Sequence, residues 1–231
     1  MRLRLIGQLI LTKCIEQCII NKWQVVSANT DGIEVIVPRH MLKQYQEILD
    51  MVCNKFKLDL EHEYYNKIVY KNVNNYIAVT KDGKYKQKGL FVPNPVLGNS
   101  VDELVIAKAL EAYYTKGISP KEFITNPQQY GLHIYDYCKS NKIGKDFTVY
   151  HNGQIQQQLN RYYFSKKGTY LFKQKHGQGT MQHVNVGQPV IIYNVHEEKP
   201  WKDYNIDYNY YISATQKIID ELNNNNQLKL F

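Results

Sequence analysis

The most informative stretch of the chain reads Val25-Val26-Ser27-Ala28-Asn29-Thr30-Asp31-Gly32-Ile33-Glu34-Val35. Two apolar runs enclose a short Asn/Asp/Gly segment, a pattern typical of a β-hairpin. The pattern predicts strands over 24–28 and 33–37, joined by a turn at 29–32. Asn and Asp favour turns because their side chains bond to the local backbone. A carboxylate in such a turn is also held stiffly at the rim of the sheet, where a Mg²⁺ ion could use it as a hard oxygen ligand.

The flanking sequence predicts how this hairpin is embedded. Apolar residues at helical spacing indicate helices over 3–20 and 40–56, one on each side of it. Strands are predicted over 67–71 and 75–80, and an Asp-Gly turn at 82–83 leads into the segment 84–90. The order helix, hairpin, helix, hairpin predicts an α+β fold with an antiparallel sheet.

The second part of the chain follows a segment rich in Pro, Gly and Asn at 93–99, which we interpret as a linker. A helix is predicted over 101–114, and Ser119-Pro120 has the pattern of a helix N-terminus. From residue 144 the pattern becomes strand-like and aromatic, and a final helix is predicted over 212–222. The sequence therefore predicts a boundary between residues 1–91 and 92–231.

The composition sets broad limits on function. The chain has 231 residues, of which 43% are hydrophobic, and this content excludes a wholly disordered chain. No apolar run approaches the roughly 20 residues of a membrane-spanning helix. The net charge is +8, and only four of the 29 basic residues are Arg. Both a solvated lysine surface and a face that binds a polyanion are compatible with this charge.

The cysteines and histidines suggest no metal site. Cys14 and Cys18 are four residues apart on a predicted helix, and Cys53 and Cys138 stand alone. A zinc site needs closer pairs, or histidines at matching spacing. We expect buried, reduced cysteines in a cytoplasmic protein.

The order of motifs resembles DNA polymerases of family B, the group that includes many phage replicative enzymes. The stretch 25–35 resembles motif C of that family, in which two hydrophobic strands flank an Asp-Thr-Asp turn. The stretch 71–77 resembles the KxY motif, and 81–90 is similar to the Lys-rich hairpin that leads out of the palm. Residues 102–124 stand where the family has its helical thumb, and 159–168 resembles a segment of phage polymerase C-terminal regions.

This resemblance implies a fold and a reaction. Residues 1–91 would be the C-terminal part of the palm, with its antiparallel sheet and packed helices. Residues 92–231 would be a mostly helical thumb followed by a β-rich C-terminal extension. The implied activity is that of a DNA-directed DNA polymerase, which uses two Mg²⁺ ions to transfer a nucleotide from a dNTP to a primer.

The resemblance also implies roles for single residues. Asp31 matches the second Asp of motif C, a catalytic residue and metal ligand in the family, and Asn29 stands at the position of the first Asp. Tyr76 matches the Tyr of KxY, which contacts the primer. The Lys of that motif falls on Asn74, and Lys71 could substitute from a neighbouring position.

The same resemblance implies that this chain does not complete an active site alone. Two-metal catalysis needs a further carboxylate, and the family places it, with the helix that grips the dNTP, upstream of the stretch that begins here. An N-terminal polymerase fragment or subunit is the expected partner, together with primer-template DNA and dNTP. The Mg²⁺ site would be shared with that partner.

Two groups of basic residues are candidate DNA contacts. Lys84, Lys86 and Lys88 alternate, so on a strand they would lie on one face and could bind a phosphate backbone. Lysines on an edge strand also protect it from aggregation.

The second group is Arg161, Lys166 and Lys167, which are interleaved with the aromatic run 162–164. These residues could contact a duplex backbone or stack on bases. Aromatic residues in such a run are equally typical of a core.

Two further functions remain open from the residues alone. One is a non-catalytic nucleic-acid-binding remnant of a polymerase, in which Asn29 marks the loss of catalysis. The other is a Mg²⁺-dependent nuclease, which needs a carboxylate cluster and has as its candidates Glu34, Asp59, Glu61 and Glu63.

Overall fold

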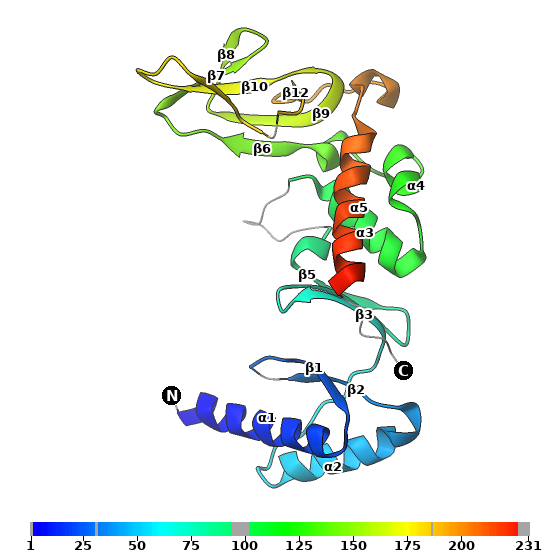
Figure 1. The fold of residues 1–231 in the computed structure, drawn as a ribbon. Helices are drawn as coiled ribbons and strands as arrows, with labels where there is room; N and C mark the ends of the chain where they lie inside the picture. Colours follow the sequence, from blue (N-terminus) through cyan, green and yellow to red (C-terminus); the bar gives the residue numbers. More distant parts are fainter. Residues whose placement is uncertain (1, 31, 94–101, 186, 226–231) are drawn as a thin grey trace. The chain divides into compact units, whose positions relative to one another are not determined.

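The computed structural model describes residues 2–30, 32–93, 102–185 and 187–225 (Figure 1). The chain divides into two compact units. The N-terminal unit comprises residues 1–66 and 80–84, and the C-terminal unit comprises residues 67–79 and 85–231. The α+β class predicted from the sequence is confirmed, since helices are combined with antiparallel sheets in both units.

The N-terminal unit packs two helices against one hairpin. Its elements are α1 (Arg2–Ile20), β1 (Gln24–Ala28), β2 (Ile33–Ile36) and α2 (Leu42–Asn54). The strands pair antiparallel with Val25 opposite Val35, and the register shifts between Val25 and Ser27. All four elements agree with the predicted order, although the second helix begins only after a short 3-10 turn at Arg39–Met41.

The core of this unit is small. Its buried residues are spaced four apart on α1 and meet partners from α2 and from the start of the hairpin; they are Ile10, Cys14, Cys18, Trp23, Leu49 and Cys53. The sulfur atoms of Cys14 and Cys53 lie 3.9 Å apart. Burial, together with the neighbouring Cys53, raises the pKa of Cys14 to about 12. These cysteines are therefore packed thiols, as the sequence predicts.

The C-terminal unit begins with an antiparallel sheet in the order β3-β4-β5. The strands are β3 (Tyr65–Asn72), β4 (Asn75–Thr80) and β5 (Tyr85–Lys88). Val69 and Ile77 from this sheet are buried in one cluster with residues of the following helices, among them Leu110 and Leu222. One face of the β3-β4-β5 sheet therefore packs against these helices.

Three helices make up the middle of this unit: α3 (Leu104–Lys116), α4 (Pro120–Thr125) and α5 (Tyr208–Asn225). The hydroxyl of Ser119 accepts a hydrogen bond from the amide of Glu122 and Pro120 opens the helix, which confirms the predicted N-terminus of α4. The last helix begins four residues earlier than predicted. Tyr211, on its first turns, is fully buried against Phe164, so tertiary packing extends the helix beyond its apolar repeat.

Two further sheets form the rest of the C-terminal unit. The first has the order β12-β9-β6, with β6 (Lys139–Lys142), β9 (Leu159–Thr169) and β12 (Val190–Ile192). The second has the order β11-β10-β7-β8, with β7 (Phe147–His151), β8 (Gln154–Gln156), β10 (Leu171–Lys175) and β11 (Met181–His183). Residues of both sheets share one core with α3 and α4. The short strands β6, β8, β11 and β12 were not predicted, because three or four residues carry too little alternation to stand out.

The compact units do not divide the chain at the boundary expected between residues 91 and 92. The β3-β4-β5 sheet packs on α3 and α5, so it belongs to the same unit as the helices that follow it. The expected linker at 93–99 lies almost entirely outside the described residues. Whether residues 1–91 form one functional part stays a prediction.

Directly after β5, the backbone at Gly89 packs closely against the β3-β4 hairpin. This residue has a φ of +63°, and a Cβ at this position would overlap the backbone oxygen of Asn74 and the side-chain oxygen of Asn75. The same side-chain oxygen accepts a hydrogen bond from the amide of Leu90 at 3.0 Å. Glycine is therefore required here for both conformation and space.

We predict that Gly89→Ala destabilises the C-terminal unit by about 3 kcal/mol or more, because strain from the positive φ adds to a clash with backbone. Gly83→Ala is the matched control, since Gly83 has a φ of +81° with nothing within 4 Å of the added Cβ. This control is expected to cost only about 1 kcal/mol. Denaturant unfolding measures both values, and equal costs would contradict the close approach.

Candidate nucleic-acid interface

The tip of the first hairpin is closed by Asn29. Its amide donates to the carbonyl of Gly32 at 3.0 Å, and its Oδ1 accepts from the amide of Gly32 at 2.8 Å. Asn29 therefore shapes the turn, as Asn commonly does. Asp31, the main catalytic and metal-ligand candidate, lies outside the described residues.

The carboxylate of Glu34 lies next along this hairpin, on β2 opposite Ser27. Its Oε2 is buried and has no hydrogen-bond partner among the described residues. Burial raises the pKa of Glu34 above its usual value, because the charged form is poorly solvated there.

The described residues do not make a metal site by themselves. Across residues 2–30, 32–93, 102–185 and 187–225, no group of three or more His, Cys, Asp or Glu side chains could hold a metal ion. The oxygen that Asn29 offers is neutral and already accepts the Gly32 amide. The carboxylates considered for a nuclease do not gather either, since Asp59, Glu61 and Glu63 are exposed on an irregular segment. A Mg²⁺ ion at this turn would need Asp31 and carboxylates from elsewhere.

The clearest arrangement of candidate residues lies on the β3-β4-β5 sheet. Tyr76 on β4 is directly opposite Lys88 on β5, and Ala78 is opposite Lys86. Residues that are paired across strands, or two apart along one strand, share a face. Tyr76, Lys86 and Lys88 therefore lie on one face, and the buried Ile77 points to the other.

Sequence reasoning missed one member of this face, Tyr70. Its ring stacks on Tyr76 with centroids 5.9 Å apart and an interplanar angle of 15°. Its position next to the buried Val69 in β3 could have revealed it, because side chains alternate along a strand. We call Tyr70, Tyr76, Lys86 and Lys88 the tyrosine–lysine face.

Two lysines expected from the sequence have carboxylate partners. Lys71 is two residues from the buried Val69, so it points toward the helices, where its Nζ lies 3.6 Å from a carboxylate oxygen of Glu221 on α5. Lys84 precedes β5 in the turn of the hairpin, and its Nζ lies 3.0 Å from Asp82. Of the three alternating lysines, Lys86 and Lys88 lie on β5, and Lys84 directly precedes that strand.

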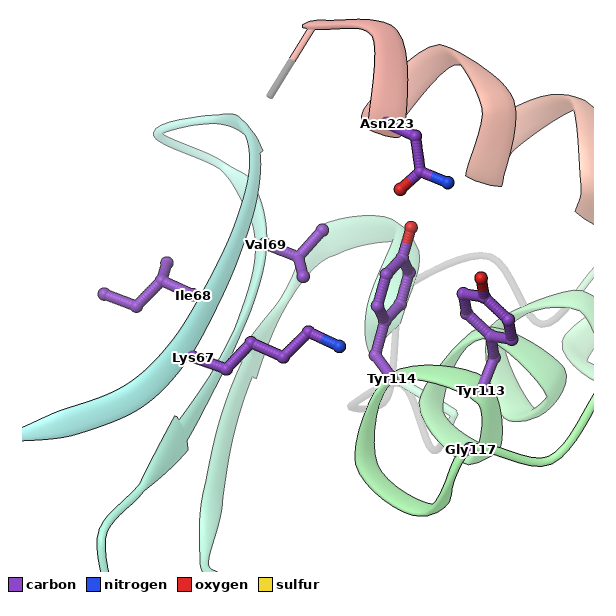
Figure 2. A pocket seen from close by; sticks show the side chains of 7 residues that line it. All are labelled: Lys67, Ile68, Val69, Tyr113, Tyr114, Gly117 and Asn223. Atoms are coloured by element: carbon purple, nitrogen blue, oxygen red, sulfur yellow. The ribbon is translucent and has the colours of Figure 1, made fainter. Parts of the chain in front are cut away.

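A pocket of about 430 Å³ lies on the core side of the same sheet (Figure 2). It is lined by residues of β3, α3 and α5: Lys67, Ile68, Val69, Tyr113, Tyr114, Gly117 and Asn223. Figure 2 shows Val69 and Lys67 turned toward Tyr114, whereas Ile68 points to the other side of the strand. Burial raises the pKa of Tyr114 to about 12, so its hydroxyl stays protonated at neutral pH. This pocket has no carboxylate and is not a candidate active site.

The second basic group is divided by the structure. Tyr162, Tyr163 and Phe164 are buried in the core, which decides between the two roles considered for these aromatic residues. Lys166 and Lys167 are exposed at the end of β9. Arg161 is exposed as well, and its guanidinium lies 4.9 Å from the ring centroid of Tyr135. Any nucleic-acid contact here would involve the three cations rather than the aromatic run.

The positive charge is concentrated in the C-terminal unit. Residues 1–66 carry eight basic and eight acidic side chains, so the whole net charge of +8 arises from residues 67–231. Residues 67–88, which span the β3-β4-β5 sheet, carry six basic residues and one acidic residue. A surface of this sign favours a polyanion as partner.

Comparison with known proteins provides no family for this chain. Neither a scan against protein-family models nor a search of curated proteins found a match. Among the helices of the described residues, none is long and apolar enough to cross a membrane.

We predict that Glu34→Gln stabilises the protein at neutral pH, because it removes a poorly solvated charge. The raised pKa means that the folded state binds this proton more tightly than the unfolded state. The charge on Glu34 therefore destabilises the folded state at pH values above the pKa of Glu34 in the folded protein. This cost disappears as the pH falls toward the pKa of Glu34 in the unfolded chain. Thermal melts from pH 4 to pH 8 should show a gain that shrinks toward acid pH. Glu47→Gln is the control, since Glu47 is exposed beside Lys43, and an equal gain there would contradict the explanation.

Proposed function

We propose that this chain binds primer-template DNA and is the C-terminal part of a family B-like DNA polymerase. The observation that carries the proposal is the tyrosine–lysine face. It aligns Tyr76, the residue matching the KxY tyrosine, with Lys88 across the strand pair. The order helix, hairpin, helix, hairpin along residues 2–88 agrees with the palm arrangement that the motifs imply.

The chemistry of this face suits a nucleic-acid backbone. Ammonium groups of Lys86 and Lys88 neutralise phosphates without reading sequence, as a polymerase requires. The stacked pair of Tyr70 and Tyr76 adds two aromatic rings and two hydroxyl groups beside these cations. Backbone binding of this kind holds a primer-template in register while leaving the base sequence free.

In the proposed reaction a nucleotide passes from a dNTP to the primer 3′ hydroxyl. Asp31 is the proposed catalytic residue and, with Asn29, the proposed ligand of Mg²⁺ in this chain. The metal would supply Lewis-acid stabilisation of the phosphoryl group undergoing transfer. What the chain itself contributes is a turn held rigid by Asn29 and Gly32, and a face that binds the primer-template.

The proposal requires a partner, an N-terminal polymerase fragment or subunit that supplies the other carboxylate and the dNTP-binding helix. The N-terminal unit has the surface for one. Among the described residues, eight of the fifteen exposed large hydrophobic residues lie in it: Leu5, Ile6, Leu9, Ile19, Ile20, Met51, Phe56 and Leu58. Leu5 and Leu9 are one turn apart on α1, and 58% of Leu9 is exposed. Leu5, Ile6 and Leu9 are neighbours on the first turns of α1, and exposed apolar side chains that gather in this way are typical of an interface.

The hairpin of the N-terminal unit supports the same conclusion. Within the described residues β1 and β2 form a sheet of only two strands, so each strand has one edge without a neighbouring strand. Additional strands from the partner would extend this sheet and cover its edges. The four cysteines of the chain are free and buried. Because free thiols are typical of proteins in a reducing compartment, we propose a cytoplasmic location, in the host cytoplasm if the chain is encoded by a phage.

We predict that the double variant Lys86→Ala/Lys88→Ala binds duplex DNA more weakly and lowers the slope of log affinity against log salt by up to about 1.8, since each phosphate contact contributes about 0.9. Fluorescence anisotropy with a labelled primer-template measures both quantities. Lys121→Ala on α4 is the control, because it removes an exposed lysine from another surface. An unchanged slope in the double variant would rule out the tyrosine–lysine face as the DNA contact.

Primer extension tests catalysis directly. The chain should be assayed with Mg²⁺ alone, and then mixed with the product of the reading frame immediately upstream. We predict extension only in the mixture, and a loss of roughly a thousand-fold or more for Asp31→Ala, because a metal ligand contributes several kcal/mol to the transition state. Asp59→Ala is the matched control, an exposed carboxylate of the same unit.

A non-catalytic DNA-binding remnant is the second candidate. Asn29 favours it, because this neutral side chain uses its oxygen to close the turn. The remnant predicts DNA binding without extension in any mixture, with equal binding by the wild type and Asp31→Ala. The two assays together therefore separate the two candidates.

A further inference from the structure

The pocket on the core side of the β3-β4-β5 sheet contains a polar group that the fold leaves unsatisfied. Tyr114 on α3 is only 7% exposed, and its hydroxyl has no hydrogen-bond partner among the described residues. A buried hydroxyl without a partner is costly, because water solvates it in the unfolded chain. Figure 2 shows this hydroxyl directed toward Asn223, whose side chain also lines the pocket. Asn223 is exposed, so rotation of its side chain is enough to open the hydroxyl to a ligand.

A positive charge lies beside this hydroxyl. Lys67 on β3 is exposed, and its Nζ lies 5.0 Å from the centroid of the Tyr114 ring. Within the part of the chain that the structure describes, this ammonium group has no ion pair. The hydroxyl of Tyr114 stays protonated at neutral pH, because burial raises its pKa to about 12. The ammonium group and the hydroxyl are therefore two neighbouring hydrogen-bond donors.

The acidic residues near the pocket have partners of their own. On α5, Glu221 pairs with Lys71 at 3.6 Å, and Asp220 accepts a hydrogen bond from the side-chain amide of Gln216 at 2.8 Å. Both carboxylates line a different hollow of α5 rather than this pocket. The lining of the pocket therefore carries one positive charge and no negative charge.

The size and the walls of the pocket limit what it can hold. Its volume of about 430 Å³ lies in the range of roughly 300–1,000 Å³ that is typical of small-molecule sites. Val69 and the ring of Tyr113 supply apolar wall, and the amide of Asn223 supplies a further polar group. An ammonium group and a hydroxyl donor beside apolar walls match an anionic head group on a small apolar body.

We propose that this pocket binds a small molecule that carries a carboxylate or phosphate group on a compact apolar body. The anionic group accepts hydrogen bonds from Lys67 and from the hydroxyl of Tyr114, and the body packs against Val69 and Tyr113. The ligand thereby gives the buried hydroxyl the partner that it lacks. The inference involves no residue of the tyrosine–lysine face or of the proposed metal site, and it goes beyond the proposed polymerisation.

Three probes that share one benzene ring test the proposal on the wild type. They are benzoate, phenyl phosphate and the neutral benzyl alcohol, titrated while the NMR signals of the backbone amides of Val69 and Gly117 are followed. Saturable shifts are expected with an anion in the millimolar range typical of such small molecules. Benzyl alcohol should bind about ten-fold more weakly or less. The anion that binds more tightly identifies the head group. No shift with either anion, or equal binding of benzyl alcohol, would overturn the proposal.

Two substitutions each remove one of the donors. Lys67→Ala and Tyr114→Phe should each weaken binding of the tighter anion about ten-fold or more, because a hydrogen bond to a charged group is lost. Lys81→Ala is the matched control, since the Nζ of Lys81 lies 4.7 Å from the ring centroid of Tyr64, outside the pocket. Unchanged affinity in both folded variants would contradict the assigned contacts.

The stability of Tyr114→Phe tests the unsatisfied hydroxyl independently of any ligand. Its removal should raise the melting temperature by about 2 °C or more, because a buried group without a partner is removed. Tyr163→Phe is the control, since the buried hydroxyl of Tyr163 also lacks a partner among the described residues but does not line the pocket. It should give a similar gain and leave anion binding unchanged. A lower melting temperature for Tyr114→Phe would show that its hydroxyl has a partner inside the protein, and the proposal would fail.

DNA binding separates this inference from the proposed function. Tyr114→Phe should leave the affinity for duplex DNA unchanged, and Lys86→Ala/Lys88→Ala should leave anion binding unchanged. Failure of primer extension would not affect the NMR titration, and failure of the titration would not affect primer extension. Displacement of the bound anion by duplex DNA would overturn the proposal, because the anion site would then belong to the nucleic-acid surface.

Discussion

The packing of Val69 and Ile77 against α3 and α5 is the constraint on which the candidate interface depends. Once these two side chains are buried, the alternation of the strands assigns every other residue of the β3-β4-β5 sheet to one face or the other. Lys71 is directed to Glu221, and Gln87 to Glu111, whose carboxylate accepts its side-chain amide at 2.7 Å. Tyr76, Lys86 and Lys88 remain on the opposite face. A shift of one residue in register would reverse all of these positions.

The two units differ in how completely they bury their apolar residues. The C-terminal unit joins two sheets and its helices in one continuous core with many fully buried tyrosines. Six of the described residues of the N-terminal unit form its buried core, and much of α1 is exposed. Small cores provide little stability, so the N-terminal unit gains most from a partner that covers it. The small core of the N-terminal unit and the proposed polymerase function both indicate that this unit needs a partner chain.

Much of the local structure could be predicted from the sequence, because it depends on neighbours in the chain. The two helices around the first hairpin, the Asn-containing turn and the Ser119 cap are all determined within a few residues. The predicted roles of Asp31 and Asn29 stay predictions, since they come from resemblance. Lys86 and Lys88 lie on β5 as expected, and Lys84, the third lysine of the row, directly precedes the strand and has Asp82 as its partner at 3.0 Å.

By itself the sequence determined the order of the helices and hairpins up to residue 88, the α+β class and the basic character of residues 67–231, all of which follow from local pattern and composition. Only the tertiary structure decided which side chains face solvent. Tyr162 to Phe164 and Tyr150 with Phe172 both occur in aromatic stretches of similar appearance, yet the first group is buried and the second lies on an outer face. The reason is that β7 pairs with β10, and β9 with β6 and β12, over separations of about twenty residues or more. Such pairing sets the inner and outer faces, and no local pattern encodes it.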